Sequence, residues 1–290
     1  MNKSEFEAIS SHAVTVAGFE FKTGIFPSEM AFVLTAIEKS DCDFVIDSGR
    51  GPDAFSLLCL QGYQKNTIKR PKLFSLDTDS VDDKHFFRDF SDNPDIVLKV
   101  GNSFDDIPDL YRENKEGVWA VIIDGPKHED QILLSLLVIK HMRPRILALR
   151  NSPPGSLQQR ILDPDHTGRY YEQYAFKENE FIQLLTLNVE QSRRTLEQSS
   201  LLLFSNPTLP SRIPHGLWIQ FRVCSFFWTL KITISGFTLV YKWIARPARL
   251  ILWKMPFVKS RVRTIFRRLR KSFILMLYPI YIKFKRAIEK

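Results

Sequence analysis

Three short apolar runs in the first half of the chain each end in an aspartate, and helical patterns separate them. The runs end at Asp47, Asp77 and Asp124. Apolar runs that alternate with helices are typical of βαβ units, in which parallel strands form one sheet between layers of helices. Because the carboxyl ends of parallel strands lie along one edge of the sheet, we expect the three acids to line a single ligand-binding crevice.

The same alternation predicts the fold class. Strands are expected at 44–47, 72–77, 95–100, 118–124 and 145–149, and helices at 28–39, 53–62, 81–90, 103–114 and 129–141. Two further strand-like runs, 180–189 and 200–204, are separated by polar residues and predict a terminal antiparallel hairpin. The sequence therefore predicts an α/β, doubly wound, mostly parallel Rossmann-like sheet.

A glycine-rich turn, with Gly49 and Gly51, joins the first strand to the next helix. Glycines let the backbone approach a ligand closely, and a helix N-terminus favours a negative group. Residues 49–54 match the dinucleotide pattern G-x-G-x-x-A, but Asp77 lies 28 positions after Gly49, whereas the usual spacing is about 20. The acid two residues before Gly49, Asp47, suits an ammonium group better than a pyrophosphate. The sequence therefore favours an enzyme whose cofactor carries an ammonium group, and an NAD(P)-dependent enzyme is the alternative.

Four segments together resemble the motifs of class I S-adenosylmethionine-dependent methyltransferases. DFVIDSGRGPDAFSLL resembles their motif I, LFSLDTD the motif whose acid holds the ribose, and VGNSFDDIPDL the segment beside the adenine. VIIDGPKHEDQILLSLLVIKHMRPRILAL resembles the branch of macrocin-type O-methyltransferases and cephalosporin-hydroxylase-like proteins, and the terminal hairpin fits the same fold. The resemblance covers residues 28–205. It implies S-adenosylmethionine as the cofactor, bound by Asp47, Gly49, Gly51, Asp77, Asn102 and Asp124.

The chain also departs from the family pattern. Asp53 stands where motif I has a third glycine, Asn102 replaces an acid, and residues 149–152 lack the acids that metal-dependent members carry. A hard cation wants several oxygen ligands, so no metal is predicted. Asp124 and His128 are the catalytic candidates, with His128 as a general base for a hydroxyl acceptor. A solvent-facing histidine on the first turn of a helix is the alternative for His128.

Charge divides the chain into two parts. Residues 1–214 carry 24 Lys or Arg and 31 Asp or Glu, whereas residues 215–290 carry 17 Lys or Arg and one acid, Glu289. This asymmetry indicates two different segments, the second of which needs an anionic partner. We expect a methyltransferase-like α/β domain over 1–205, a proline-rich linker over 206–214, and a basic helical segment over 215–290.

The expected partner of the basic segment is an anionic membrane surface. The segment combines Lys and Arg with Trp, Phe and Leu, as do helices that lie in a membrane interface. Residues 223–241 approach the length of a span, about 20 residues, but the central Lys231 costs about 2.5–3.5 kcal/mol on insertion. A single span and a packed helical subdomain are alternatives. Nucleic acid is the least favoured partner, because a phosphate-binding arm needs few apolar residues.

The cysteine content and the N-terminus bear on location. Cys42, Cys59 and Cys224 are odd in number and widely spaced, which predicts no disulfide framework or metal knuckle and favours a reducing compartment. The polar N-terminus predicts no signal peptide. We therefore expect a cytoplasmic protein, peripheral or monotopic at the inner membrane face.

The expected function is methyl transfer from S-adenosylmethionine to a hydroxyl of a glycan, lipid-linked or other small-molecule acceptor at that face. The departures from the family pattern keep one further alternative, a non-catalytic methyltransferase-like protein that binds or scaffolds.

Overall fold

The computed structural model describes residues 27–50, 55–66, 69–78, 90, 93–153, 155–163, 169–170 and 201–233. The chain divides into two compact units, Met1–Tyr241 and Lys242–Lys290, and all the described residues belong to the first. The fold and the candidate site are therefore features of the first unit.

Six helices and seven strands follow one another along the described residues. The helices are α2 (Pro27–Lys39), α3 (Phe55–Asn66), α5 (Ser103–Glu113), α6 (Glu129–Met142), α7 (Leu157–Leu162) and α10 (His215–Thr233). The strands are β1 (Phe44–Ser48), β2 (Lys72–Asp77), β3 (Ile96–Val100), β4 (Trp119–Ile123), β5 (Ile146–Leu149), β6 (Arg169–Tyr170) and β7 (Leu202–Ser205). Each of the five expected parallel strands is present. The expected strand at 180–189, and the expected helix at 81–90 apart from its last residue, lie outside the described residues.

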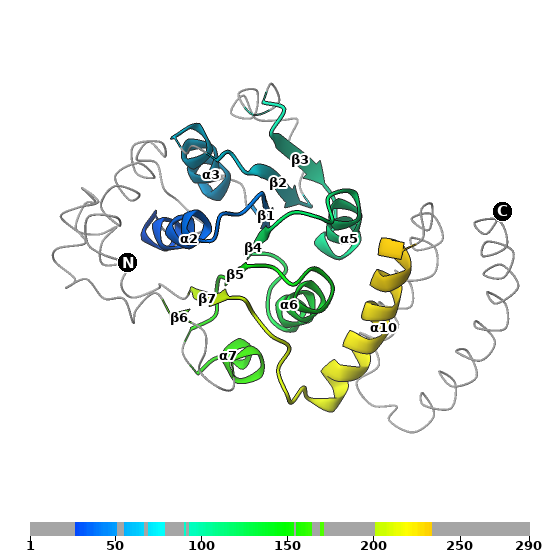
Figure 1. Ribbon diagram of the computed structural model, residues 1–290. Helices are drawn as coiled ribbons and strands as arrows, with labels where there is room; N and C mark the ends of the chain where they lie inside the picture. The colour runs from blue at the N-terminus through cyan, green and yellow to red at the C-terminus, as the bar shows by residue number, and fades with distance from the viewer. Residues whose placement is uncertain are drawn as a thin grey trace, which may run out of the picture. The chain divides into compact units, whose positions relative to one another are not determined.

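The strands form one sheet in the order β3-β2-β1-β4-β5-β7-β6 (Figure 1). β1 to β5 run parallel, and β7 pairs antiparallel with β5 and with the short β6. The order of the strands reverses at β1, so the carboxyl ends of β1 and β4 mark the switch point at which open α/β sheets bind ligands. This architecture confirms the predicted fold class, a doubly wound, mostly parallel Rossmann-like sheet with terminal antiparallel strands.

The sheet is buried on both faces, because successive residues of a strand point to opposite sides. Ile46 and Val121 pack with α5 and α6 on one face. Val45 and Ala120 pack with α2 and α3 on the other face. Figure 1 shows these two helix pairs on opposite sides of the sheet. Strands buried in this way are apolar along their length, so polar side chains appear where the strands end.

Helix α10 packs on the outside of α5 and α6 (Figure 1). Its buried face repeats at helical spacing and consists of Leu217, Phe221, Cys224, Ser225, Trp228 and Lys231. The Trp228 side chain is fully buried, and its indole Nε1 donates a 2.9 Å hydrogen bond to the Phe104 carbonyl oxygen of α5. Burying each large apolar side chain contributes about 1.5–3 kcal/mol. Helix α10 is therefore a packed part of the first unit.

A buried ion pair also joins α10 to α5. Lys231 Nζ lies 2.7 Å from Asp109 Oδ2, and it donates to the Asp105 carbonyl oxygen as well. Arg112 lies 3.1 Å from Asp109 Oδ1 and donates to the Lys231 carbonyl oxygen at 2.9 Å. The Lys231 side chain is only 1% exposed. Its charge, at the centre of the run 223–241, is therefore balanced by the Asp109 carboxylate rather than by water.

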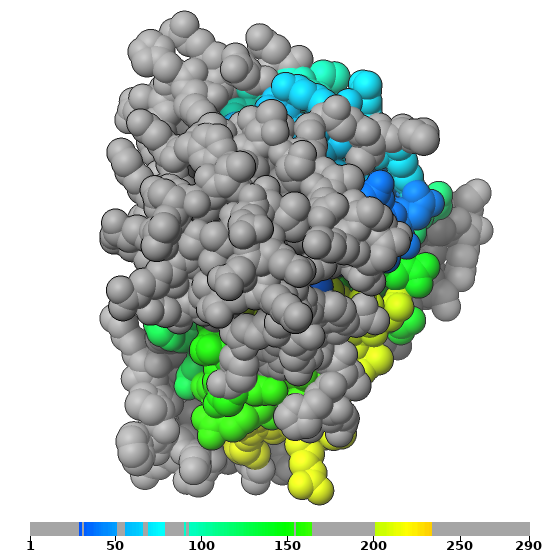
Figure 2. Space-filling model, turned by 90° about the vertical axis from the view of Figure 1, so that its left-hand side faces the viewer, coloured from blue at the N-terminus to red at the C-terminus, as the bar shows by residue number. Residues whose placement is uncertain are grey.

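A connecting segment leads from the sheet to α10 within the first unit. Residues 206–214 connect β7 to α10, and the first compact unit extends to Tyr241. In Figure 2, atoms in yellow, the colour of this part of the chain, reach the surface beside green atoms. The domain boundaries that composition and charge predict, at 205 and 214, stay predictions. Among the described helices, none has the length and apolar character needed to cross a bilayer.

Candidate functional site

The three strand-end acids lie at the carboxyl edge of the sheet. Asp47 is in β1, opposite Ser75 of β2 and Ile122 of β4. Asp77 ends β2, and Asp124 directly follows β4. The charge of Asp124 acts on the carboxyl of Asp47, so these two acids lie near each other at the switch point.

Asp47 is the most enclosed of the three acids, with an exposed fraction of 1%. Ser56 Oγ donates to Asp47 Oδ2 at 2.8 Å, and Ser75 Oγ donates to the same oxygen at 3.3 Å. Oδ1 has no hydrogen-bond partner in the described part of the chain. Burial, together with the smaller effect of Asp124, raises the pKa of Asp47 to about 7. Asp47 therefore exchanges its proton near neutral pH and has one oxygen available to a donor.

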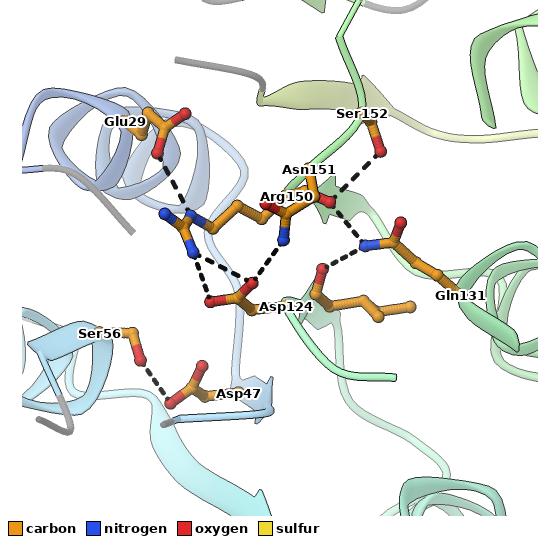
Figure 3. Close-up of polar contacts among 9 residues, drawn as sticks. Glu29, Asp47, Ser56, Asp124, Gln131, Arg150, Asn151 and Ser152 are labelled. Carbon is orange, nitrogen blue, oxygen red and sulfur yellow. Dashed lines mark hydrogen bonds and ion pairs between the residues drawn. The ribbon is translucent and has the colours of Figure 1, made fainter. Parts of the chain in front are cut away.

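Arg150 is the centre of a charged cluster at the ends of β4 and β5 (Figure 3). Its Nη1 lies 3.2 Å from Asp124 Oδ2, and its Nε lies 3.7 Å from Glu29 Oε2 of α2. Asn151 Nδ2 donates to Asp124 Oδ1 at 3.1 Å. Burial raises the pKa of Asp124, and Arg150 opposes this effect. Both oxygens of Asp124 thus already have protein donors, with which a cofactor or an acceptor must compete.

The fully buried Gln131 fixes the backbone around Arg150. Its Nε2 donates to the carbonyl oxygens of Ile123 at 3.0 Å and Arg150 at 2.7 Å, and its Oε1 accepts from Gln158 Nε2 at 3.2 Å. Sequence patterns did not single out Glu29, Gln131 or Arg150. The signal that could have found Arg150 is its place directly after the fifth strand, at the carboxyl edge of the sheet. Glu29 is indistinguishable by sequence from an ordinary acid in the first turn of a helix.

Gly49 allows the loops after β1 and β4 to touch. Its φ is +87°, and a Cβ there would lie 2.4 Å from the Gly125 nitrogen. Beside it, Ser48 Oγ donates to the Gly125 carbonyl oxygen and lies 2.6 Å from Ser103 Oγ. The backbone of the protein therefore requires a glycine at position 49 whether or not a ligand binds. Gly51 lies outside the described residues.

Asp77 and Asn102 lie at adjoining strand ends, because Gly101 N donates to the Asp77 carbonyl oxygen at 2.8 Å. Asn102 is the N-cap of α5, and its Oδ1 accepts from Phe104 N at 2.9 Å. Asn102 is therefore left with its amide nitrogen for a ligand. The Asp77 side chain, at the end of β2, is half-buried. The cofactor-binding roles of both residues stay predictions.

His128 is the exposed N-cap of α6, and its side chain makes no capping hydrogen bond. Among the described residues, no hydrogen bond or ion pair joins the His128 ring to the cluster around Asp124. Its role as a base therefore stays a prediction. No group of three or more His, Cys, Asp or Glu side chains among the described residues is arranged to hold a metal ion. The three cysteines are free and buried.

The chain matches no family model. No curated protein matches it either. Among solved structures, the 23S rRNA methyltransferase ErmE is similar in fold, with a TM-score of 0.32 and 11% sequence identity over 74% of this chain and 83% of that chain. A likeness of this size says nothing further about what the chain does, so the function rests on the residues of the crevice.

Proposed function

We propose that the chain is an S-adenosylmethionine-dependent methyltransferase that acts on a hydroxyl group. The observation that carries this proposal is Asp47, a buried carboxyl at the switch point whose Oδ1 has no partner among the described residues. Burying a carboxylate without a partner costs free energy. The ammonium group of S-adenosylmethionine would lower that cost, whereas the pyrophosphate of a dinucleotide would raise it.

The residues of the crevice fit this cofactor. Asp47 offers an oxygen to the ammonium group, and Asp77 is placed at the end of β2 for the ribose hydroxyls. Asn102 offers its amide nitrogen beside the adenine position that the family resemblance implies. Gly49 keeps the turn after β1 free of a side chain. In these assignments, residues at the ends of β1, β2 and β3 bind three different parts of one cofactor.

Bound S-adenosylmethionine supplies an electrophilic methyl group. The chain itself has to align the acceptor hydroxyl, exclude water and take up one proton. His128 is the proposed proton acceptor, because an imidazole nitrogen can take up a proton from a hydroxyl group and this ring is exposed. Asp124, held by Arg150 and Asn151, is proposed to line the acceptor side of the crevice.

The acceptor that we propose is a hydroxyl of a glycan, a lipid-linked molecule or another small molecule at the cytoplasmic face of a membrane. Support for the membrane comes from the charge of residues 215–290, which carry 17 Lys or Arg and one acid. Such a segment is attracted to the anionic lipids of that leaflet.

A thermal-shift panel on the full-length chain tests the cofactor. S-adenosylhomocysteine at 100 times its dissociation constant is expected to stabilise the protein by about 2.7 kcal/mol. Stabilisation by NAD(H) alone would instead favour a nicotinamide-dependent enzyme. If S-adenosylhomocysteine binds but no glycan or phenolic acceptor is methylated, the non-catalytic alternative gains support.

Replacing Asp77 with alanine is expected to weaken the binding of S-adenosylhomocysteine at least about tenfold, because each charge-assisted hydrogen bond to the ribose contributes about 1.5–3 kcal/mol. The melting temperature without cofactor should change little, since the side chain is only half-buried. Isothermal titration calorimetry measures the affinity, and Asp95→Ala, at an exposed acid just before β3, is the control. If Asp77→Ala and the unmodified chain bind S-adenosylhomocysteine with equal affinity, Asp77 does not contact the cofactor.

A further inference from the structure

One exposed side of α10 carries aromatic groups. Trp218 and Phe226 are 45% and 46% exposed. Arg222 lies midway between them in sequence and is exposed as well. Residues four apart share one face of a helix, so these three side chains form a single surface, here named the α10 outer face. Two large aromatic side chains this exposed on one helix face mark a surface for interaction.

Lys140 of α6 adds a second positive charge beside this face. Its Nζ lies 5.2 Å from the centroid of the Phe221 ring, and Arg222 Cζ lies 5.5 Å from that of the Trp218 ring. Burial, and then the charge of Arg222, lowers the pKa of Lys140. No acidic side chain in the described part of the chain pairs with either cation. Two neighbouring cations without a carboxylate favour an anion between them.

We propose that the α10 outer face, together with Lys140, is the surface by which the α/β domain docks on a bilayer of anionic phospholipid. Lys140 and Arg222 bind lipid phosphate groups, and the rings of Trp218 and Phe226 enter the interfacial layer. Basic residues interleaved with Trp and Phe on one helix face suit this layer, where charge and apolar surface are both satisfied. The proposal concerns this surface alone, so its failure would leave methyl transfer untouched.

The buried face of α10 explains how the helix can present its outer face without leaving the domain. Trp228 and Lys231 tie the helix to α5 through a hydrogen bond and a buried ion pair. The helix therefore carries its two faces to two different neighbours, protein and lipid. Nucleic acid fits less well, because it needs a row of phosphate contacts and little apolar surface. This face offers an arginine between two large aromatic rings, and Lys140 of α6 lies near that arginine.

The test places a fluorescent probe on the α10 outer face of the full-length chain. The substitution Phe226→Cys adds one exposed thiol, whereas Cys42, Cys59 and Cys224 are buried. Burial also raises the pKa of Cys42 to about 12, which keeps that thiol unreactive. The protein that carries an environment-sensitive fluorophore on residue 226 is then mixed with two kinds of vesicle. One kind is phosphatidylcholine alone, and in the other about one lipid in three is phosphatidylglycerol. Leu157→Cys on α7, where Leu157 is 39% exposed, gives the matched control probe.

Docking predicts a blue shift of the probe on residue 226 with the anionic vesicles, a weaker shift with the neutral ones, and none for the probe on residue 157. Unchanged emission at residue 226 while the protein still sediments with vesicles would overturn the proposal, because another part of the chain would then bind. Equal shifts on neutral and anionic vesicles would overturn the role of the two cations. A blue shift with an oligonucleotide but not with vesicles would overturn the proposal and identify nucleic acid as the partner of this surface.

Reversal of one charge gives a second readout. Each basic residue near an anionic surface changes affinity about fivefold, so Arg222→Glu, which changes the charge by two, is expected to weaken vesicle binding at the residue 226 probe about 30-fold. Arg160→Glu, at an exposed arginine of α7, is the charge-matched control and should have little effect. Circular dichroism confirms that both variants fold, and equal affinities of the two would refute the assignment of Arg222.

Discussion

Replacing Lys231 with alanine is expected to lower the free energy of unfolding by about 3–5 kcal/mol, because it leaves a buried carboxylate without its main partner. Asp109 Oδ2 lies 2.7 Å from Lys231 Nζ, and the lysine side chain is only 1% exposed. Urea denaturation measures the change. If residues 223–241 crossed a bilayer instead, removing the lysine would make insertion easier and would cost the α/β domain nothing.

The double variant Lys231→Met, Asp109→Leu serves as the control for this experiment. Replacing both members of a buried ion pair with apolar residues of similar volume is often neutral or stabilising, so most of the loss should be recovered. Arg112, which also contacts Asp109, is partly exposed and can turn to water. A single variant as stable as the unmodified chain would mean that α10 is not docked on α5 through this pair.

The second large effect is expected at Asp47, where asparagine should stabilise the domain at pH 8 by about 2–4 kcal/mol. Burial raises the pKa of this carboxyl to about 7, from an ordinary value of 3.8. Between these two pH values the folded state holds a proton that the unfolded chain has released. The free energy of unfolding therefore falls as the pH rises through this window, and it stays low above it.

Asparagine keeps the shape of the side chain and removes the ionisation, so the advantage of Asp47→Asn should vanish below about pH 4. The comparison is made by urea denaturation of both proteins across the pH range, with Asp95→Asn, at an exposed carboxyl, as the control. The same variant should bind S-adenosylhomocysteine more weakly, because the ammonium group loses its charged partner. A stability difference that did not depend on pH would show that Asp47 stays ionised in the folded protein.

The parallel strands and the acids at their ends could be predicted because one physical cause produces both signals. A parallel strand between two helix layers is apolar until it reaches water, so the acids at 47, 77 and 124 marked the strand ends at the carboxyl edge of the sheet. The antiparallel strand β7 was also found by its apolar run. The two-residue β6 was not, because so short an element carries no periodicity.

Contacts between distant elements were beyond the reach of sequence patterns. A lysine within an aromatic-rich run looks the same in a membrane helix and in a helix docked by a buried ion pair. Only the position of Asp109 on α5 distinguishes the two. Likewise, Arg150 meets Glu29 because α2 lies near the end of β5, and no local spacing encodes that proximity.

The docking of α10 has a consequence for how the domain is made. Its contacts with α5 join residues 119 to 126 positions apart in sequence. During synthesis at about 5–20 residues per second, α5 leaves the ribosome several seconds before Trp228 and Lys231 exist. For that interval Asp109 has no lysine beside it, and the outer surfaces of α5 and α6 remain uncovered. We therefore expect the nascent chain to be most vulnerable to aggregation and to proteases before α10 emerges, and a chain truncated there would have an α/β sheet without α10.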